Sequence, residues 1–274
     1  MSVINTNIKA LYTQNALLRT ERNQSEAMQQ LATGKRINSA RDDAAGLAIS
    51  QRMTQQIRSL NMAVKNAGDA ISLIQTAEGA TASITDMLQR MRELAVQAGN
   101  ATNTTADRGN LDAEFQALNQ EVTRTIGATR FNGISVIGGG AGTQTFQVGE
   151  NSIDRVSVIT RNLSADGTIT SVAATAITSA DAASTAMVAI DNALSTANVE
   201  RAQYGAAQNR FEAIIATLQV ASTNNAAARG RIMDADFAAE TANLSRAQIL
   251  QQAGTAMMAQ ANQMPQQVLQ LLRG

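Results

Sequence analysis

The chain has 274 residues with 22 basic and 22 acidic side chains, contains no cysteine and no histidine, and is only 3% aromatic. These counts exclude disulfides, thiolate or imidazole chemistry and the usual zinc sites, and we expect no cofactor. The balanced charge gives no reason to expect nucleic acid or an anionic membrane as a partner. With so few aromatic rings, the chain must build its core by packing helices closely through aliphatic side chains.

The start of the chain, MSVINTNIKALYTQN, contains no continuous apolar region and no cleavage site of the secretory type. A cleaved signal peptide is therefore not expected. No window reaches 18 uninterrupted apolar residues, so we expect no membrane insertion. If the protein leaves the cell, it should use a dedicated exporter.

Residues 5–31 are predicted to form a first helix, because apolar residues recur along one stripe, and Gly34 is expected to end it. Residues 35–43, KRINSARDD, are polar and highly charged. Within them, Ser39 or Asp42 could cap the helix that follows. We interpret this segment as a connector between two packed layers.

A long helix is predicted for residues 42–99. Its apolar residues follow alternating steps of three and four, with one extra step of three at Ile74 to Ala77, which resembles a stammer. Such spacing is typical of a coiled coil, and the length favours a rod. We call this stripe the first seam; it comprises Met53, Ile57, Leu60, Val64, Ala67, Ile71, Ile74, Ala77, Thr81, Ile84, Leu88, Met91 and Ala95.

The middle of the chain changes character. Residues 99–105 are small and polar enough to reverse the chain, and residues 107–126 are predicted to fold back as a third helix. Asn132-Gly133 predicts a tight turn, and residues 143–148 and 153–160 alternate as a β-hairpin. Residues 162–184 are rich in Ala, Ser and Thr with little periodicity, so we expect a surface loop.

A second seam is predicted on another long helix, at Met187, Ile190, Leu194, Ala197, Arg201, Tyr204, Gln208, Phe211, Ile215, Leu218 and Ser222. It steps by three and four without a slip and can lie against the first seam. Residues 229–231 form a second polar connector, after which Asp234 or Asp236 could start the last helix.

The last helix is unusually apolar. Between residues 244 and 274 the only charged side chains are Arg246 and Arg273, so this terminus would be poorly soluble alone. Pairing with the first helix would leave outer faces uncovered, and we expect self-assembly to cover them. The stripe of this helix comprises Leu250, Gly254, Met257, Ala261, Met264, Val268 and Leu271.

These elements predict a mainly α fold: a long-helix coiled-coil bundle with a small β-hairpin region, and N- and C-terminal helices paired as a second coiled-coil layer. The expected domains are a terminal layer of residues 1–33 and 244–274, connectors at 34–43 and 229–243, a long-helix rod of 44–161 and 185–228, and a short variable surface loop at 162–184. For the long-helix seam we expect the main packing residues to be Ile57, Leu60, Ile71, Leu88, Phe211, Ile215 and Leu218.

Several long segments resemble the bacterial flagellin family. They are INTNIKALYTQNAL, LATGKRINSARDDAAGLAIS, LQRMRELAVQAGN, the FNG turn and SRAQILQQAGTAMMAQANQMPQQVLQLL. The resemblance covers residues 1–160 and 186–274. It implies a secreted structural protein that passes unfolded through the flagellar type III export apparatus and polymerises with itself, under a filament cap and beyond the hook-junction proteins, into an extracellular helical filament for swimming.

The resemblance also implies roles for particular residues. The terminal helices should line the inner tube, packing through Ile8, Leu11, Leu18, Leu250, Met257, Met264, Val268 and Leu271. The C-terminal helix resembles the segment held by the flagellin export chaperone. The segment that Toll-like receptor 5 reads in some flagellins matches here at Gln89, Arg90, Glu93, Leu94 and Gln97, with Glu114 on the neighbouring helix; the alternative is a simple solvated helix face.

The short middle segment implies a filament without large outer domains. As in some flagellins, O-linked glycans could be carried by Ser164, Thr168, Thr170, Ser171 and Thr178; the alternative is an unmodified loop.

Two pairs of carboxylates, Asp42-Asp43 and Asp234 with Asp236, invite comparison with acid–base catalysts. They sit where helices start, and capping together with the helix dipole explains them. Residues 138–142 lack the Lys and Ser or Thr that follow a phosphate-binding loop. We therefore expect a filament subunit and no enzyme, with a hook-filament junction protein or coiled-coil adaptor as the alternative, which would stay short or monomeric.

Overall fold

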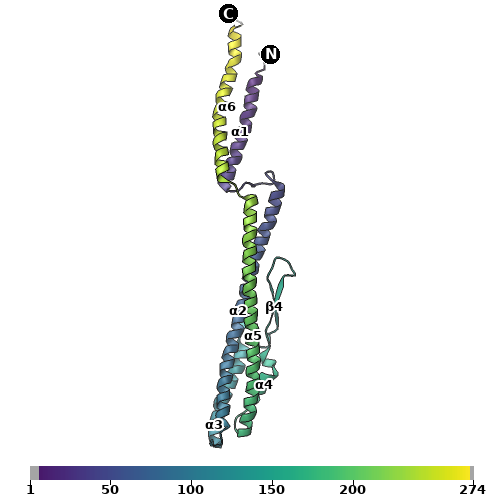
Figure 1. Ribbon diagram of the computed structural model, residues 1–274, viewed down its shortest axis with the longest axis vertical. Coiled ribbons are helices and arrows are strands. Elements are labelled where there is room, and N and C mark those ends of the chain that lie inside the picture. The colour runs from purple at the N-terminus through teal and green to yellow at the C-terminus, as the bar shows by residue number, and fades with distance from the viewer. Residues whose placement is uncertain (1–5, 272–274) are drawn as a thin grey trace. The chain divides into compact units, whose positions relative to one another are not determined.

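The computed structural model describes residues 6–271, with side chains up to residue 264 (Figure 1). Within these residues the fold is mainly helical, as predicted. Its elements are α1 (Ile8–Thr33), α2 (Ala44–Ala98), α3 (Thr105–Ala128), β1 (Arg130–Phe131), β2 (Ile134–Ser135), β3 (Thr143–Gln147), β4 (Arg155–Ile159), η1 (Leu163–Ala165), α4 (Gly167–Ala173), α5 (Ala180–Met233) and α6 (Phe237–Leu271).

The chain divides into two compact units. The first contains residues 1–55 and 224–274, and the second contains residues 56–223. The long helices α2 and α5 each contribute residues to both units.

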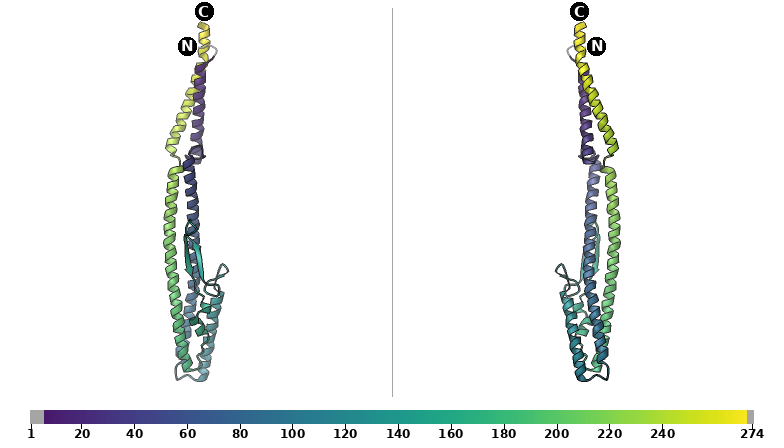
Figure 2. Two further views of the ribbon diagram at one scale, coloured as in Figure 1. Left: turned by 90° about the vertical axis from the view of Figure 1, so that its right-hand side faces the viewer. Right: turned by 90° about the vertical axis from the view of Figure 1, so that its left-hand side faces the viewer.

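In the first unit, α1 and α6 lie side by side (Figures 1 and 2). The side chain of Asn7 accepts the Ala10 N–H at 3.1 Å and starts α1. Gly34 ends this helix in the left-handed conformation, with φ 70°, and its N–H donates to the Gln30 carbonyl. The prediction that Gly34 terminates the first helix is therefore confirmed, since glycine adopts this conformation without steric cost.

The two connectors of the first unit are bonded to each other through the backbone. The N–H of Arg36 donates to the Met233 carbonyl at 2.7 Å, and the N–H of Ala235 donates to the Gly34 carbonyl at 3.0 Å. The second connector is shorter than the predicted 229–243, because α5 continues to Met233 and α6 begins at Phe237. A single glycine, Gly230, is tolerated inside α5. The non-helical connector between α5 and α6 is therefore limited to residues 234–236.

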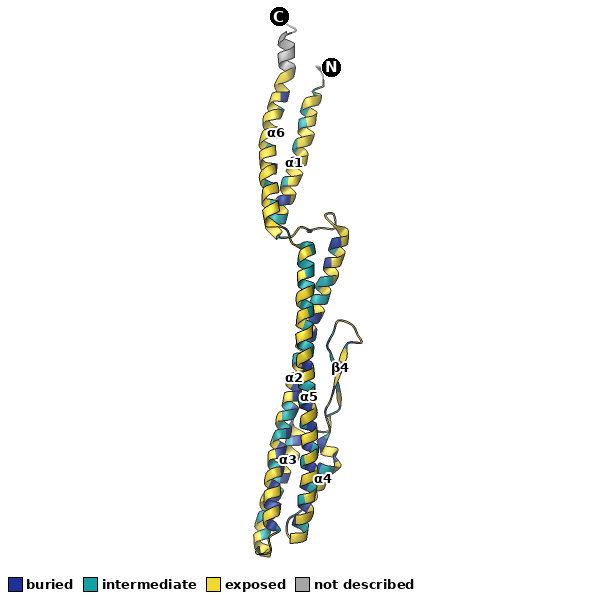
Figure 3. Cartoon of the chain, viewed as in Figure 1, coloured by how far each residue is buried: buried dark blue, intermediate teal, exposed yellow. Residues whose placement is uncertain are grey.

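In the second unit, α2, α3 and α5 pack around one hydrophobic core, in which the first seam faces the second seam. Leu88 and Phe211 are completely buried and Leu60 is nearly so, whereas Ile57, Ile71, Ile215 and Leu218 are half-buried. Figure 3 shows how buried and exposed residues alternate along these helices. The ring of Phe146 on β3 meets Phe211 edge-on, with centroids 5.9 Å apart, so the hairpin belongs to the same core.

Two small antiparallel hairpins follow α3. In the first, Asn132 and Gly133 join β1 to β2 and both have positive φ, 49° and 81°, as expected of an Asn-Gly turn. In the second, β3 pairs with β4 from Thr143↔Ile159 to Gln147↔Arg155. Val156 and Val158 of β4 face the core and their neighbours face outward, which is the alternation that the sequence predicts.

Residues 162–184 are more ordered than the loop we expected. They form η1, α4 and the start of α5, and the side chains of Leu163, Ile169, Val172 and Ile177 are buried in the core. The side-chain amide of Gln116 on α3 also donates to the Thr175 carbonyl at 2.9 Å. A helix of seven residues is too short to produce a visible periodicity, which explains why the sequence predicted a loop.

Candidate functional site

The pair of helices α1 and α6 leaves most of its apolar side chains in solvent. Among the described side chains of these two helices, the buried ones are Ala27, Ala247 and Ala261. The predicted packing residues Ile8, Leu11, Leu18, Leu250, Met257 and Met264 are instead 40–59% exposed. The other two, Val268 and Leu271, lie outside the side chains that the structure describes. A helix pair with an uncovered apolar surface of this kind requires further partners.

The contact between α1 and α6 is made by small residues. A Cβ added to Gly254 would lie 2.7 Å from Leu17 Cδ1, so the glycine allows α6 to approach α1 closely. Near the tip of the pair, the amide of Asn7 donates to the Ala261 carbonyl at 2.8 Å. Gly254 and Ala261 belong to the predicted stripe of the last helix and lie in this contact, whereas the large predicted packing residues of both helices stay partly exposed.

The predicted receptor-recognition residues gather on the surface formed by α2 and α3. The guanidinium of Arg90 donates to Glu114 at 2.9 and 3.0 Å and to Glu93 at 2.9 Å. These bonds raise the pKa of Arg90, and the bond to Glu93 makes the largest contribution. Gln89 and Gln97 are also exposed on α2.

Leu94 differs from the other members of this group. Its side chain is only 1% exposed and belongs to the hydrophobic core. Leu94 therefore cannot act as a surface contact in the folded chain, and any influence it has on this surface must come from supporting α2 from beneath.

The carboxylates that resemble catalytic pairs serve as caps. Asp42 accepts the N–H groups of Asn38 and Ser39 at 3.0 and 2.8 Å, and these backbone bonds lower its pKa. Asp43 accepts the Gly46 N–H at 2.8 Å at the start of α2. Asp236 accepts the Ala238 N–H at 2.9 Å at the start of α6. Asp42, Asp43 and Asp236 thus satisfy backbone donors at a helix end or in the connector.

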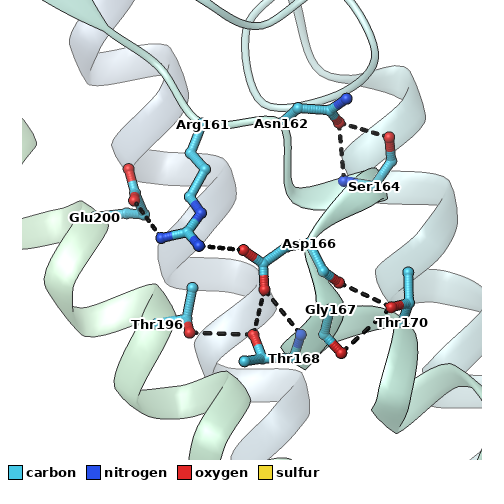
Figure 4. Close-up of polar contacts among 9 residues, drawn as sticks. All are labelled: Arg161, Asn162, Ser164, Asp166, Gly167, Thr168, Thr170, Thr196 and Glu200. Carbon is cyan, nitrogen blue, oxygen red and sulfur yellow. Dashed lines mark hydrogen bonds and ion pairs between the residues drawn. The ribbon is translucent and has the colours of Figure 1, made fainter.

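A polar cluster that the sequence did not reveal joins the η1–α4 segment to α5 (Figure 4). The guanidinium of Arg161 lies 2.6 Å from Asp166 and 3.5 Å from Glu200, and both carboxylates are 4% exposed. Asp166 also accepts the N–H and the hydroxyl of Thr168, and the Thr168 hydroxyl oxygen lies 3.1 Å from the hydroxyl oxygen of Thr196 on α5. Residue 200 is too far in sequence from residues 161 and 166 for any spacing rule to connect it to them.

One turn of α5 after Glu200 is Tyr204, which is 1% exposed and whose hydroxyl has no hydrogen-bond partner among the described residues. Burial raises the pKa of Tyr204 to about 12. Tyr204 and the two carboxylates of the cluster are buried, whereas Arg161 is half exposed, so the cluster joins a surface side chain to the buried part of α5.

The candidate glycosylation residues occupy two kinds of position. Ser164, Thr170, Ser171 and Thr178 are exposed. Thr168 is half-buried and is engaged in the cluster just described. A sugar on Thr168 would therefore have to displace its bonds to Asp166 and Thr196.

Three features define a self-associating coiled-coil structural protein. The long helices pack through repeating apolar seams, the terminal helices expose apolar side chains to solvent, and carboxylates cap helix ends. In the described residues, no helix combines the length and hydropathy needed to cross a membrane. The bacterial flagellin N-terminal helical region matches residues 4–145, and the bacterial flagellin C-terminal helical region matches residues 187–272. The chain belongs to the bacterial flagellin family.

Individual flagellins are similar in sequence to this chain over nearly its whole length. The flagellin of Halalkalibacterium halodurans is 44% identical over 99% of this chain and all of its own length. That of Bacillus subtilis is 40% identical over 98% of this chain and 99% of its own. The crystal structure of Bacillus cereus flagellin, 32% identical, superposes with a TM-score of 0.52 over 60% of this chain and 94% of that one.

Family membership fixes the general function. The protein is a structural subunit, not an enzyme, that polymerises with itself into the extracellular flagellar filament of a bacterium and so serves motility.

Proposed function

We propose that α1 and α6 form the inner layer of the filament and that the long-helix unit of α2, α3 and α5 surrounds it. The supporting observation is the row of exposed apolar side chains on α1 and α6, which a single chain leaves in contact with water. Neighbouring copies that pack these stripes together would remove that surface from solvent, at about 25 cal/mol per Å².

A helical reconstruction of filaments grown from purified monomers and short seeds tests this assignment. We expect long tubes of uniform width with density for α1 and α6 nearest the axis. Terminal helices on the outside of the tube would refute the inner-layer assignment, and short caps in place of tubes would favour a hook-filament junction protein.

We further propose that the monomer is recognised by Toll-like receptor 5 through the exposed Arg90, Glu93, Gln89, Gln97 and Glu114. The supporting observation is that Arg90 holds two carboxylates from two helices in one exposed group. Such a group offers a receptor both signs of charge in a fixed arrangement.

Cells that report receptor activation test the recognition surface. Arg90→Ala should raise the half-maximal concentration about tenfold, equivalent to about 1.4 kcal/mol. The matched control is Arg124→Ala, which breaks another exposed pair, to Glu121, and should leave the response unchanged. Equal potency of the two variants would indicate an ordinary solvated helix face.

We also propose that the export chaperone holds the C-terminal helix before the type III apparatus secretes the chain, and that the filament cap and the hook-junction proteins are further partners. The scarcity of charge between residues 244 and 274 supports chaperone binding, because an apolar helix needs cover in the cytoplasm. A chain lacking residues 245–274 should lose chaperone binding in a co-purification assay, and retention of binding would contradict the proposal.

A further inference from the structure

The turn between β1 and β2 contains the one sequence in the chain, Asn132-Gly133, in which an asparagine is followed by glycine. The backbone nitrogen of the following residue can attack an asparagine side-chain amide, and glycine has no side chain to hinder this attack. Both residues of the turn are exposed. The turn is therefore a place where the backbone of the chain can react with one of its own side chains.

The amide of Asn132 is also free, unlike those of the two asparagines that are followed by serine. Within the part of the chain that the structure describes, the side-chain hydrogen bond of this turn goes to the Gly133 carbonyl and leaves the Asn132 amide without a partner. Asn38 donates its amide to the Lys35 carbonyl at 2.9 Å. Asn151 donates its amide to the Asp154 carboxylate at 3.0 Å. Hydrogen bonds therefore hold the other two amides in place.

An aspartate followed by glycine can undergo the same attack, and the chain has one such sequence, Asp166-Gly167. Asp166 is 7% exposed and its carboxylate is bonded to Arg161 and Thr168. Burial raises the pKa of Asp166, but the bonds from Thr168 and the charge of Arg161 bring it below its ordinary value. The carboxylate therefore stays ionised, and an ionised carboxylate is a poor target for a nucleophile. The structure protects this sequence and leaves Asn132 open to attack.

The turn at Asn132 can open without unfolding the second unit. The strands β1 and β2 form only two residue pairs, and a two-stranded hairpin has little stability of its own. Asn132 has a φ of 49°, a left-handed conformation that a residue with a side chain adopts at some energetic cost. The attack requires the Asn132 backbone to rotate out of this conformation, and the short hairpin makes such local opening inexpensive.

We infer that Asn132 is a site of spontaneous deamidation, with water as the co-reactant. The Gly133 nitrogen gives its proton to water and bonds to Cγ of Asn132. The Cγ–Nδ2 bond then breaks, and the nitrogen leaves as ammonia after taking a proton from water, so that a succinimide ring remains. Water opens this ring in one of two ways: breaking the new bond to Cγ leaves aspartate, and breaking the bond to the main-chain carbonyl carbon leaves isoaspartate. Nothing is oxidised or reduced.

Isoaspartate changes the hairpin as well as its charge. It adds one backbone carbon to a two-residue turn whose length sets the register of the two strands. The strand β2 leads directly into Val136 and Ile137, which are 1% and 0% exposed, and the Val136 N–H donates to the Thr129 carbonyl at 3.2 Å. We expect this hydrogen bond to weaken, so that ageing of the chain loosens the hairpin beside the core.

Peptide mass spectrometry of the folded monomer after incubation at mildly alkaline pH tests the site. The tryptic fragment of residues 131–155 carries both Asn132 and Asn151, so the two are compared within one peptide. We expect Asn132 to convert about tenfold faster than Asn151, and within about tenfold of its own rate in urea, because the turn opens locally. Equal rates at the two asparagines, or protection of Asn132 by about a hundredfold relative to urea, would overturn the inference.

Asn132→Gly is the matched control, since glycine accepts the positive φ and has no amide to lose. After incubation we expect hydrogen exchange at the Val136 N–H to be about tenfold faster in the wild type and unchanged in Asn132→Gly. Freshly purified Asn132→Asp adds the charge without the extra backbone carbon, and its exchange should match that of the fresh wild type. Unaltered exchange in a chain that has converted to isoaspartate would overturn the loosening of the hairpin.

Discussion

Arg161 and Asp166 form an ion pair in which the guanidinium Nη2 lies 2.6 Å from a carboxylate oxygen of a side chain that is 4% exposed. Burial raises the pKa of Asp166, but the hydrogen bonds from Thr168 together with the charge of Arg161 outweigh it, and the pKa lies below its ordinary value. The pair attaches the η1–α4 segment to α5, where Glu200 completes the cluster.

Acid should weaken this attachment. Because the pKa of Asp166 is lower in the folded chain than in the unfolded chain, the carboxylate stabilises the fold above its unfolded pKa of about 3.8, and the stabilisation is lost as the pH falls through the folded value. We expect the melting temperature of the monomer to drop below about pH 4 less steeply in Asp166→Asn than in the wild type. Circular dichroism melts across this range measure it, with the exposed Asp181→Asn as control; parallel curves for wild type and Asp166→Asn would contradict the prediction.

Removing the cation should destabilise the fold at neutral pH. Arg161→Ala leaves Asp166 and Glu200 buried without their shared partner, which costs about 3–5 kcal/mol for a fully buried pair; because Arg161 is itself half exposed, we expect about 2 kcal/mol. Arg124→Ala, which breaks an exposed pair, should cost less than about 0.5 kcal/mol. Chemical denaturation of the monomers compares the two, and equal costs would mean that the cluster contributes no more than a surface pair.

A charge placed in the seam should prevent filament formation. Leu88 is fully buried between the long helices, so Leu88→Asp should cost several kcal/mol, on the order of 4, through the buried carboxylate and the lost packing. The neighbouring Gln89→Asp, on the exposed side, should have little effect. Electron microscopy after seeded assembly checks both variants, and normal filaments from Leu88→Asp would show that the seam register is wrong.

Deleting the C-terminal part of α6 should leave a monomer. Without residues 245–274, α1 loses most of its partner, and the exposed apolar residues Leu250, Met257 and Met264 are gone. We expect a soluble chain that sediments as a monomer under assembly conditions, because the apolar residues that α6 contributes to the proposed self-contact are missing. Polymers grown from this truncation would refute the role assigned to the last helix.

The helices could be predicted because they repeat one signal many times. The seam from Met53 to Ala95 recurs over more than ten steps, and its members from Leu60 onward are buried or half-buried. The Asn132-Gly133 turn and the Gly34 helix end followed from the backbone preferences of single residues. Short elements gave no such signal: α4 has seven residues and was expected to be a loop.

The candidate surfaces likewise divide into features that the sequence predicted and features that it did not. The sequence by itself determined the coiled-coil repeat, the apolar terminal helix and the family, since each is a local or periodic property of the chain. Only the tertiary structure decided that Leu94 is in the core and that Arg161 joins Asp166 to Glu200. These facts depend on which residues distant in sequence become neighbours, and helical periodicity specifies the face of a residue but not the partner it meets.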